Sequence, residues 1–93
     1  MFERDRQLPE NIKLGRAKAL EVVILGGAVR VPKKFKVRFW IERRGARIDY
    51  YIVYNEKVYH MTYIEFRRRF KILDKAEEIK IKDDFPEEQE ATS

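Results

Sequence analysis

The clearest trace of catalytic chemistry in this sequence is a carboxylate placed two residues before a lysine. Glu78-Ile79-Lys80 has the acid-x-Lys spacing with which some nucleases complete a metal site. Such a site also needs a second carboxylate that converges on the metal. Asp74 is too close in sequence to supply it, and Asp49 belongs to a different predicted strand. In a chain with 40% charged residues this spacing arises by chance, so we interpret Lys80 as protecting a strand edge.

Other catalytic and metal-binding residue types are scarce. The chain has no cysteine, its only serine is Ser93, and its single histidine, His60, has no evident nucleophile beside it. A Ser or Cys triad therefore cannot be assembled, and the His and Cys clusters that usually hold a metal are missing. We interpret His60 as a half-exposed strand residue, with hydrogen bonding or stacking as the functional alternative. The sequence predicts a protein that binds and is not an enzyme, with no cofactor and no metal.

The distribution of charge indicates the kind of partner. The formal net charge is +5, but residues 11–73 carry sixteen Lys and Arg against five Asp and Glu. The two ends together carry five basic and eleven acidic residues. A basic body of this kind attracts polyanions, so we predict binding to nucleic acid, DNA or RNA, with little sequence preference. The alternative is a protein-interaction module, such as a viral or accessory factor, that docks on an acidic protein partner.

A basic and aromatic surface is predicted on one face of the central strands. Trp40 is out of phase with the apolar alternation around it, so it is expected to project with Lys36 and Arg38 away from the core. Aromatic rings stack on bases while lysine and arginine neutralise phosphates. Stacking is assigned to two aromatic residues and attraction of phosphates to the cations, which gives the predicted binding residues Lys36, Arg38, Trp40, Arg43, Arg44, Tyr51, Arg67, Arg68 and Arg69.

Burial is the alternative for the aromatic residues of this surface. The N-terminal segment could cover Trp40 and Tyr51, and the flanking cations would then extend along that apolar surface. If Trp40 is exposed, Trp40→Ala weakens binding without unfolding the domain, whereas a buried Trp40 makes the same change destabilising. The cluster at 67–69 has its own restriction, because three consecutive helical residues cannot all face one partner.

A β-hairpin in the middle of the chain must position these residues. Apolar and polar residues alternate over 35–42 and again over 47–54. A two-residue turn at Arg44-Gly45 gives every apolar residue of one face an apolar partner on the other strand. The predicted pairs are Phe35 with Tyr54, Val37 with Ile52, Phe39 with Tyr50, and Ile41 with Ile48.

A third strand and a helix follow the hairpin. A turn at Asn55-Glu56 returns residues 57–61 beside the second strand, which completes a three-stranded meander. Thr62 and Glu65 have the Thr-x-x-Glu spacing of a capping box, which predicts a helix from Tyr63 to about Ile72. The apolar stripe expected to cover the meander consists of Tyr63, Phe66, Phe70 and Leu73.

The segments on either side are patterned less clearly. Gly26-Gly27 lies between β-branched residues and predicts another hairpin, with strand from about Ala19. A helix over residues 10–25 is the competing interpretation, because the apolar spacing also fits a helix that ends at a glycine. Residues 78–82 alternate like an edge strand, although Asp74 and Glu77 could instead cap a second helix.

The predicted architecture is α+β and mainly β. It is a small antiparallel, barrel-like sheet, made of the Gly-Gly hairpin and the meander and packed by one C-terminal helix. We expect a loosely ordered N-terminus over 1–10, one globular domain over 11–82, and an acidic disordered tail over 83–93. Small basic β-barrels that serve as archaeal chromatin proteins, and RNA-binding ribosomal proteins, are analogies at the level of fold alone. A composition rich in charge, poor in amides and free of cysteine suggests a cytoplasmic protein from a thermophile.

Overall fold

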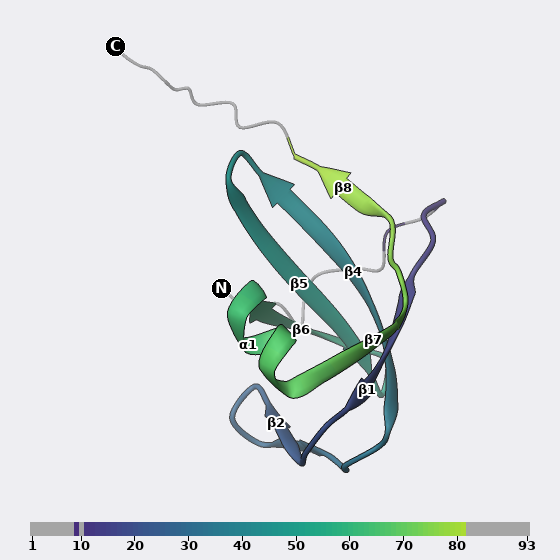
Figure 1. The fold of residues 1–93 in the computed structure, drawn as a ribbon, viewed down its shortest axis with the longest axis vertical. Coiled ribbons are helices and arrows are strands. Elements are labelled where there is room, and N and C mark those ends of the chain that lie inside the picture. Colours follow the sequence, from purple (N-terminus) through teal and green to yellow (C-terminus); the bar gives the residue numbers. More distant parts are fainter. Residues whose placement is uncertain (1–8, 10, 82–93) are drawn as a thin grey trace.

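The fold is a small α+β domain made mostly of antiparallel sheet (Figure 1). The computed structural model describes residues 9 and 11–81, so the predicted acidic tail and nearly all of the predicted loose N-terminus lie outside the described residues. The described elements follow one another as β1 (Gly15–Ala19), β2 (Val23–Leu25), β3 (Val29–Val31), β4 (Lys36–Arg44), β5 (Arg47–Tyr54), β6 (Lys57–Thr62), α1 (Tyr63–Arg69), β7 (Phe70–Asp74) and β8 (Glu78–Lys80).

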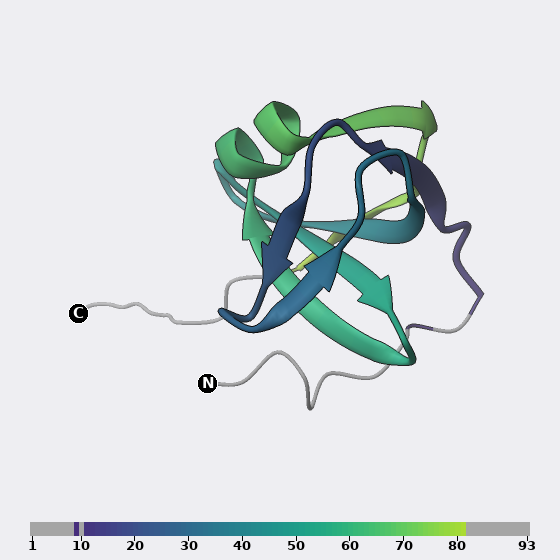
Figure 2. The same ribbon diagram turned by 90° about the horizontal axis from the view of Figure 1, so that it is seen from below.

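The main sheet has the strand order β6-β5-β4-β1-β7, with β8 beside β4 (Figure 1). β1 and β8 lie one after the other along the same edge of β4. β1 pairs antiparallel with residues 36–39, and β8 pairs parallel with residues 41–43. Because β6 and β7 lie at opposite ends of this order, the sheet is not closed into the predicted barrel-like form. β2 and β3 form a separate two-stranded sheet at the lower end of the molecule, which Figure 2 shows from below.

The β4–β5 hairpin has the predicted faces but not the predicted register. Its turn lies one residue later than expected, at Gly45-Ala46, so Arg44 pairs with Arg47 and Phe39 with Ile52. Gly45 has a φ of 59°, which suits a glycine at the first central position of a two-residue turn. Moving the turn by one residue shifts every partner by two, and this shift leaves each side chain on its predicted face.

The second hairpin and the start of the helix are confirmed. Asn55 and Glu56 both have positive φ, and β6 returns beside β5 with Met61 opposite Tyr50. Thr62 caps α1 through a reciprocal capping box with the third helical residue. The short-range signals in this part of the sequence therefore determine the local structure.

The helix ends earlier than predicted, at Arg69. Phe70 is already extended and begins β7, which pairs with the edge of β1 that β4 leaves open. Phe66 and Phe70 are buried, but Tyr63 and Leu73 are 42% and 38% exposed, so half of the expected apolar stripe packs. α1 is seven residues long, and no helix in the described part of the chain has the length and apolar character to cross a membrane.

Residues 15–19 form a strand, which rules out the alternative helix over 10–25. The strand predicted from about Ala19 to the Gly-Gly turn corresponds to β2 and begins later, at Val23. The inward positions of β1 hold only small residues because β1 passes close to its neighbours. A methyl group on Gly15 would lie 2.6 Å from the carbonyl oxygen of Asp74, closer than such atoms approach. The Gly26-Gly27 hairpin forms as predicted, with positive φ at both glycines and a third turn residue, Ala28.

The main core lies between one face of the sheet, α1 and the β2–β3 hairpin. The ring of Phe66 is at its centre, with ring centroids 4.3 Å from Tyr50, 4.9 Å from Phe39 and 5.0 Å from Phe70. Buried aliphatic residues of β2 and β3 complete this cluster. The opposite face of the sheet points away from this core.

Candidate functional site

The predicted stacking residues are buried. Trp40 is 0% exposed and Tyr51 is 4% exposed, and their rings stack with centroids 5.3 Å apart. The indole Nε1 of Trp40 donates a hydrogen bond of 3.0 Å to the buried carboxylate of Glu42. Trp40 does project away from the main core, as expected, but neither ring is accessible to a base. Both residues are therefore buried, which was the alternative to the predicted stacking surface.

A second small core explains this burial. Trp40, Tyr51 and Val58 pack with Ile12 and Leu14, and with Ile79 of β8 and Val53, on the outer face of the sheet. The N-terminal segment is fixed there by backbone pairing, because Glu77 donates its N–H to the Lys13 carbonyl oxygen at 2.8 Å. The outer face therefore has a covered half, over which these segments lie, and a second half along β1 and β7.

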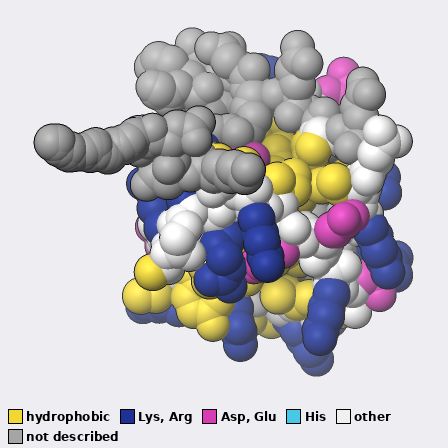
Figure 3. Space-filling model, turned by 90° about the horizontal axis from the view of Figure 1, so that it is seen from above, with side chains coloured by type: hydrophobic (Ala, Val, Ile, Leu, Met, Phe, Trp, Pro, Cys, Tyr) yellow, Lys and Arg dark blue, Asp and Glu magenta, His cyan; other side chains and the backbone are white. Residues whose placement is uncertain are grey.

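The arginines at the tip of the β4–β5 hairpin are engaged with carboxylates. Arg43 contacts Glu78 at 3.1 Å, Arg47 contacts Asp49 at 3.0 Å, and Arg44 lies 3.9 Å from Glu42. Seen from that end of the molecule, basic side chains are interspersed with acidic ones (Figure 3). Arg43 and Arg44 do not form one site with Lys36 and Arg38, because the two pairs lie towards opposite ends of β4.

The three helical arginines point to different surroundings, as expected. Arg67 lies over the ring of Tyr63 and hydrogen-bonds its hydroxyl, while Arg69 contacts Glu21 at 3.4 Å. Arg68 is exposed. α1 packs on the core face of the sheet, so this cluster lies on the other side of the sheet from Lys36 and Arg38.

The structure brings together a different set of cations, which we call the cationic face. Within it, Arg16 on β1 lies directly opposite Arg38 on β4. Lys18 on β1 lies between Lys36 on β4 and Lys71 on β7. Cross-strand partners project to the same side of a sheet, so the cationic face consists of Arg16, Lys18, Lys36, Arg38 and Lys71.

The charges of the cationic face are largely uncompensated. Arg16 forms an ion pair with Asp74. Among residues 9 and 11–81, no carboxylate forms an ion pair with Lys18, Lys36, Arg38 or Lys71. Like charges directly opposite each other destabilise a sheet. A surface with rows of like-charged lysines and arginines is chemically suited to an anionic partner.

Sequence reasoning identified two of these five cations, Lys36 and Arg38. It missed Arg16 and Lys18 because no strand was predicted before about Ala19, and the competing interpretation of residues 10–25 was a helix. The signal was present in Gly-Arg-Ala-Lys-Ala, where small and basic residues alternate with the period of a strand. Lys71 was missed because it was placed in the helix and not in β7.

A buried carboxylate that contacts a histidine and an arginine lies at the margin of the covered half. Asp49 is 3% exposed, and its oxygens lie 2.7 Å from His60 Nε2 and 3.0 Å from the Arg47 guanidinium. Burial alone would raise the pKa of Asp49, but the hydrogen bonds from His60 and Arg47 outweigh it and lower that pKa. His60 lies on this face with Tyr51, and their ring centroids are 5.4 Å apart.

This lowered pKa predicts acid sensitivity. A carboxylate with a depressed folded-state pKa stabilises the fold above its unfolded value of about 4 and loses that contribution as pH falls through the folded value. We expect Asp49→Asn to reduce the free energy of unfolding at neutral pH and to flatten its decline below about pH 4. Denaturant titrations at several pH values measure both effects. Glu21→Gln, which removes an exposed ion pair, should keep the wild-type pH dependence, and an equal flattening in both variants would contradict the assignment.

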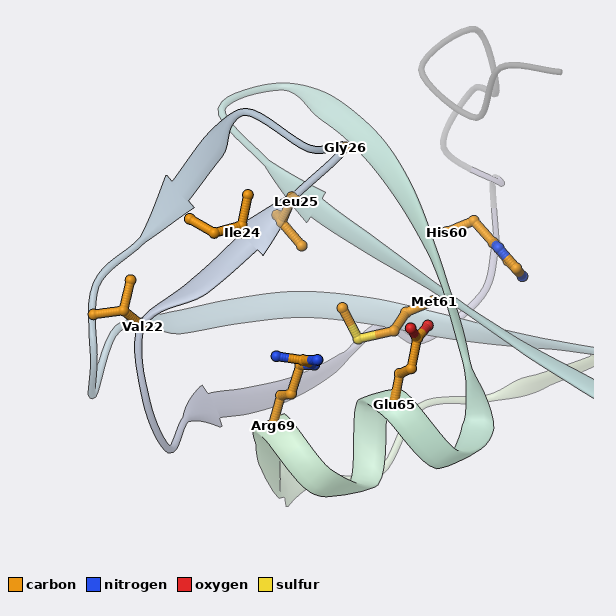
Figure 4. Close-up of a pocket in the computed structure, with 8 residues that line it drawn as sticks. All are labelled: Val22, Ile24, Leu25, Gly26, His60, Met61, Glu65 and Arg69. Carbon is orange, nitrogen blue, oxygen red and sulfur yellow. The ribbon is translucent and has the colours of Figure 1, made fainter.

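A pocket of about 330 Å³ lies between the β2–β3 hairpin, β6 and α1 (Figure 4). Its aliphatic wall includes Ile24 and Met61, and its polar wall includes Glu65 and Arg69. Both polar groups are engaged within the chain, because Glu65 completes the capping box and Arg69 contacts Glu21. We therefore assign this pocket no ligand.

The acid-x-Lys motif does not assemble a metal site in the described structure. Glu78 contacts Arg43 and Asp74 contacts Arg16, so each carboxylate is paired with an arginine. No group of three or more metal-ligating side chains gathers within residues 9 and 11–81. Comparisons with protein-family models, with curated proteins and with solved structures found no match.

Proposed function

We propose that this protein binds nucleic acid through the cationic face, by contacts with phosphates and with little dependence on sequence. The observation that supports this proposal is the cross-strand rows of cations, of which only Arg16 has a carboxylate partner among the described residues. Lys36 and Arg38 are two residues apart on one strand, a separation of about 7 Å, and neighbouring strands lie about 5 Å apart. Such an array offers several positive charges to a polymer that carries a phosphate at every nucleotide.

The mechanism is electrostatic. Each phosphate neutralised by lysine or arginine releases condensed counterions, which favours binding at low salt. A bound polyanion also relieves the repulsion between Lys18 and its two lysine neighbours. Trp40 and Tyr51 take no direct part in this mechanism, and the hairpin-tip and helical arginines contribute long-range attraction. We place this activity in the cytoplasm, the location expected from the cysteine-free sequence.

Equilibrium binding across a salt series tests the proposal. Mixed-sequence DNA and RNA, single- and double-stranded, are titrated by fluorescence anisotropy. With about four phosphate contacts, log K should fall with log[salt] with a slope of about −3 to −4. Polyglutamate serves as an acidic polypeptide control and should bind more weakly. Absence of binding to every nucleic acid at low salt would contradict the proposal, and tighter binding to polyglutamate would favour the alternative of an acidic protein partner.

A further inference from the structure

An exposed phenylalanine adjoins the end of the cationic face, with its ring on the other side of the sheet, against Tyr54. Phe35 is 45% exposed and immediately precedes Lys36 in the sequence. Its backbone is fixed against β1, because the Ala19 N–H donates to the Phe35 carbonyl oxygen at 2.9 Å. Its ring packs edge-on with Tyr54, with centroids 5.4 Å apart and planes at 82°. Phe35 is thus held by its backbone and on one side of its ring, while much of its surface is open to solvent.

The turn that presents Phe35 has an unfavourable residue at its third position. The Phe35 N–H donates to the Pro32 carbonyl oxygen at 3.2 Å, which closes a four-residue turn. Lys34 occupies the third position with a φ of 75°, where glycine or asparagine is normally preferred. Lys33 and Lys34 are both exposed, and no described carboxylate forms an ion pair with either. Backbone strain of this kind often accompanies function, and here it keeps a positive charge beside an exposed ring.

Other aromatic residues are less suited to contact a base. Trp40 and Tyr51 are buried beneath the second core. Tyr63 is exposed, but Arg67 lies over its ring and donates a hydrogen bond to its hydroxyl. Phe35 therefore combines an accessible ring with neighbouring lysines that form no ion pair with a carboxylate of residues 9 and 11–81.

We propose that Phe35 stacks on an unpaired base while Lys33 and Lys34 hold the adjoining phosphates, and that the strand continues around the end of β4 onto Lys36, so that the ligand of the cationic face is a single-stranded nucleic acid. This inference rests on the proposed function and adds the class of polymer. The face of a base is accessible to a protein ring when the base is not stacked within a duplex, and base–aromatic stacking tolerates any sequence. The lysines supply the electrostatic part of binding, and Phe35 supplies the preference for single strands.

Replacement of the ring tests this assignment. Phe35→Leu keeps an apolar side chain against Tyr54 and removes the aromatic face. We expect its affinity for a mixed-sequence single-stranded oligonucleotide to fall about fivefold or more, and its affinity for the duplex to change by less than about twofold. Phe35→Trp should retain single-strand affinity, and its new indole fluorescence should be quenched by the single strand. Thermal unfolding of both variants checks that the domain remains folded.

The turn lysine gives a second, independent test. Lys34→Gly relieves the positive-φ strain and removes a phosphate contact, so it should raise the melting temperature while weakening nucleic-acid binding by about threefold or more. Glu56→Gly is the matched control, because Glu56 has a φ of 64° in the β5–β6 turn and carries the opposite charge. It should raise the melting temperature without weakening binding.

The outcomes separate the two proposals. If single strands and duplexes both bind, and Phe35→Leu weakens both equally or neither, the stacking inference is wrong while phosphate binding by the cationic face stands. If Phe35→Leu binds single strands more weakly only under conditions where the variant is partly unfolded, the stacking role of Phe35 is also wrong. If no polymer binds to the wild-type chain, the proposed function itself fails.

Discussion

Exchanging Lys36 and Arg38 for glutamate is expected to lower the affinity for nucleic acid about a hundredfold or more at moderate salt. The double exchange removes two phosphate contacts and places two negative charges at the centre of the cationic face. The fold should not suffer, because Glu at position 36 would face Lys18 and Glu at position 38 would face Arg16. Opposite-charge pairs across strands contribute about 0.2 to 1 kcal/mol each, so the free energy of unfolding should stay level or rise slightly. Anisotropy titrations and denaturant unfolding measure the two effects.

A double exchange elsewhere separates local contacts from overall charge. Arg68→Glu with Lys80→Glu changes the net charge by the same amount, on α1 and on β8. Both side chains are exposed, and neither lies on β1, β4 or β7. We expect only about a threefold loss of affinity from weaker long-range attraction. An equal loss in the two double variants would mean that net charge, and not the cationic face, determines binding.

Trp40→Ala is expected to be the most destabilising single substitution that we consider. Removing a fully buried large aromatic side chain costs about 3 to 5 kcal/mol of unfolding free energy. In this protein the change also empties the space beside Tyr51 and removes the donor that hydrogen-bonds the buried Glu42 carboxylate. For a domain of this size the melting temperature should fall by about 15 °C or more.

Thermal unfolding followed by circular dichroism measures this loss. Trp40→Phe is the matched variant, because it keeps most of the apolar contact with Tyr51 and loses the indole N–H, and it should lose less stability than Trp40→Ala. At temperatures where a variant remains folded, its nucleic-acid affinity should match that of the wild type. A stable Trp40→Ala variant with weakened binding would restore Trp40 as a base-stacking residue and contradict the buried arrangement.

The parts of the fold that could be predicted depend on neighbours in sequence. Alternation over 35–42 and 47–54 determines which side chains share a face, and the turn at Asn55-Glu56 determines the register of the following strand. The capping box at Thr62 and Glu65 determines where the helix begins. Each of these signals acts within a few residues, so each is readable without knowledge of distant contacts.

The parts that could not be predicted depend on distant pairing. β7 forms because Phe70–Asp74 finds the open edge of β1 more than fifty residues earlier in the chain, a contact that ends the helix at Arg69. The register predicted for the β4–β5 hairpin was wrong, with each residue assigned a partner two residues away from the observed one. Turns at Arg44-Gly45 and at Gly45-Ala46 place the same side chains on the same faces, so the alternation does not distinguish them. Trp40 is covered by Leu14 and Ile79, which come from opposite ends of the domain.

The residues of the candidate site also differ in whether sequence neighbours or distant strand pairing determine their position. Lys36 and Arg38 could be identified because they lie in the hairpin with the strongest alternation. Arg16 and Lys71 join them only through pairing of β1 with β4 and β7. Phe35 was expected to face Tyr54 in the core, and it does contact Tyr54, but it lies at the end of the sheet where no further layer covers it.

Chemical-shift mapping of the backbone amides tests the central claim most directly. The isotope-labelled full chain is titrated with a mixed-sequence single-stranded oligonucleotide at low salt. The cationic face predicts that the largest shift changes occur at residues 16–18, 33–38 and 71. Changes concentrated at the hairpin tip over 43–47, or on α1, would contradict the assignment of nucleic-acid binding to the cationic face.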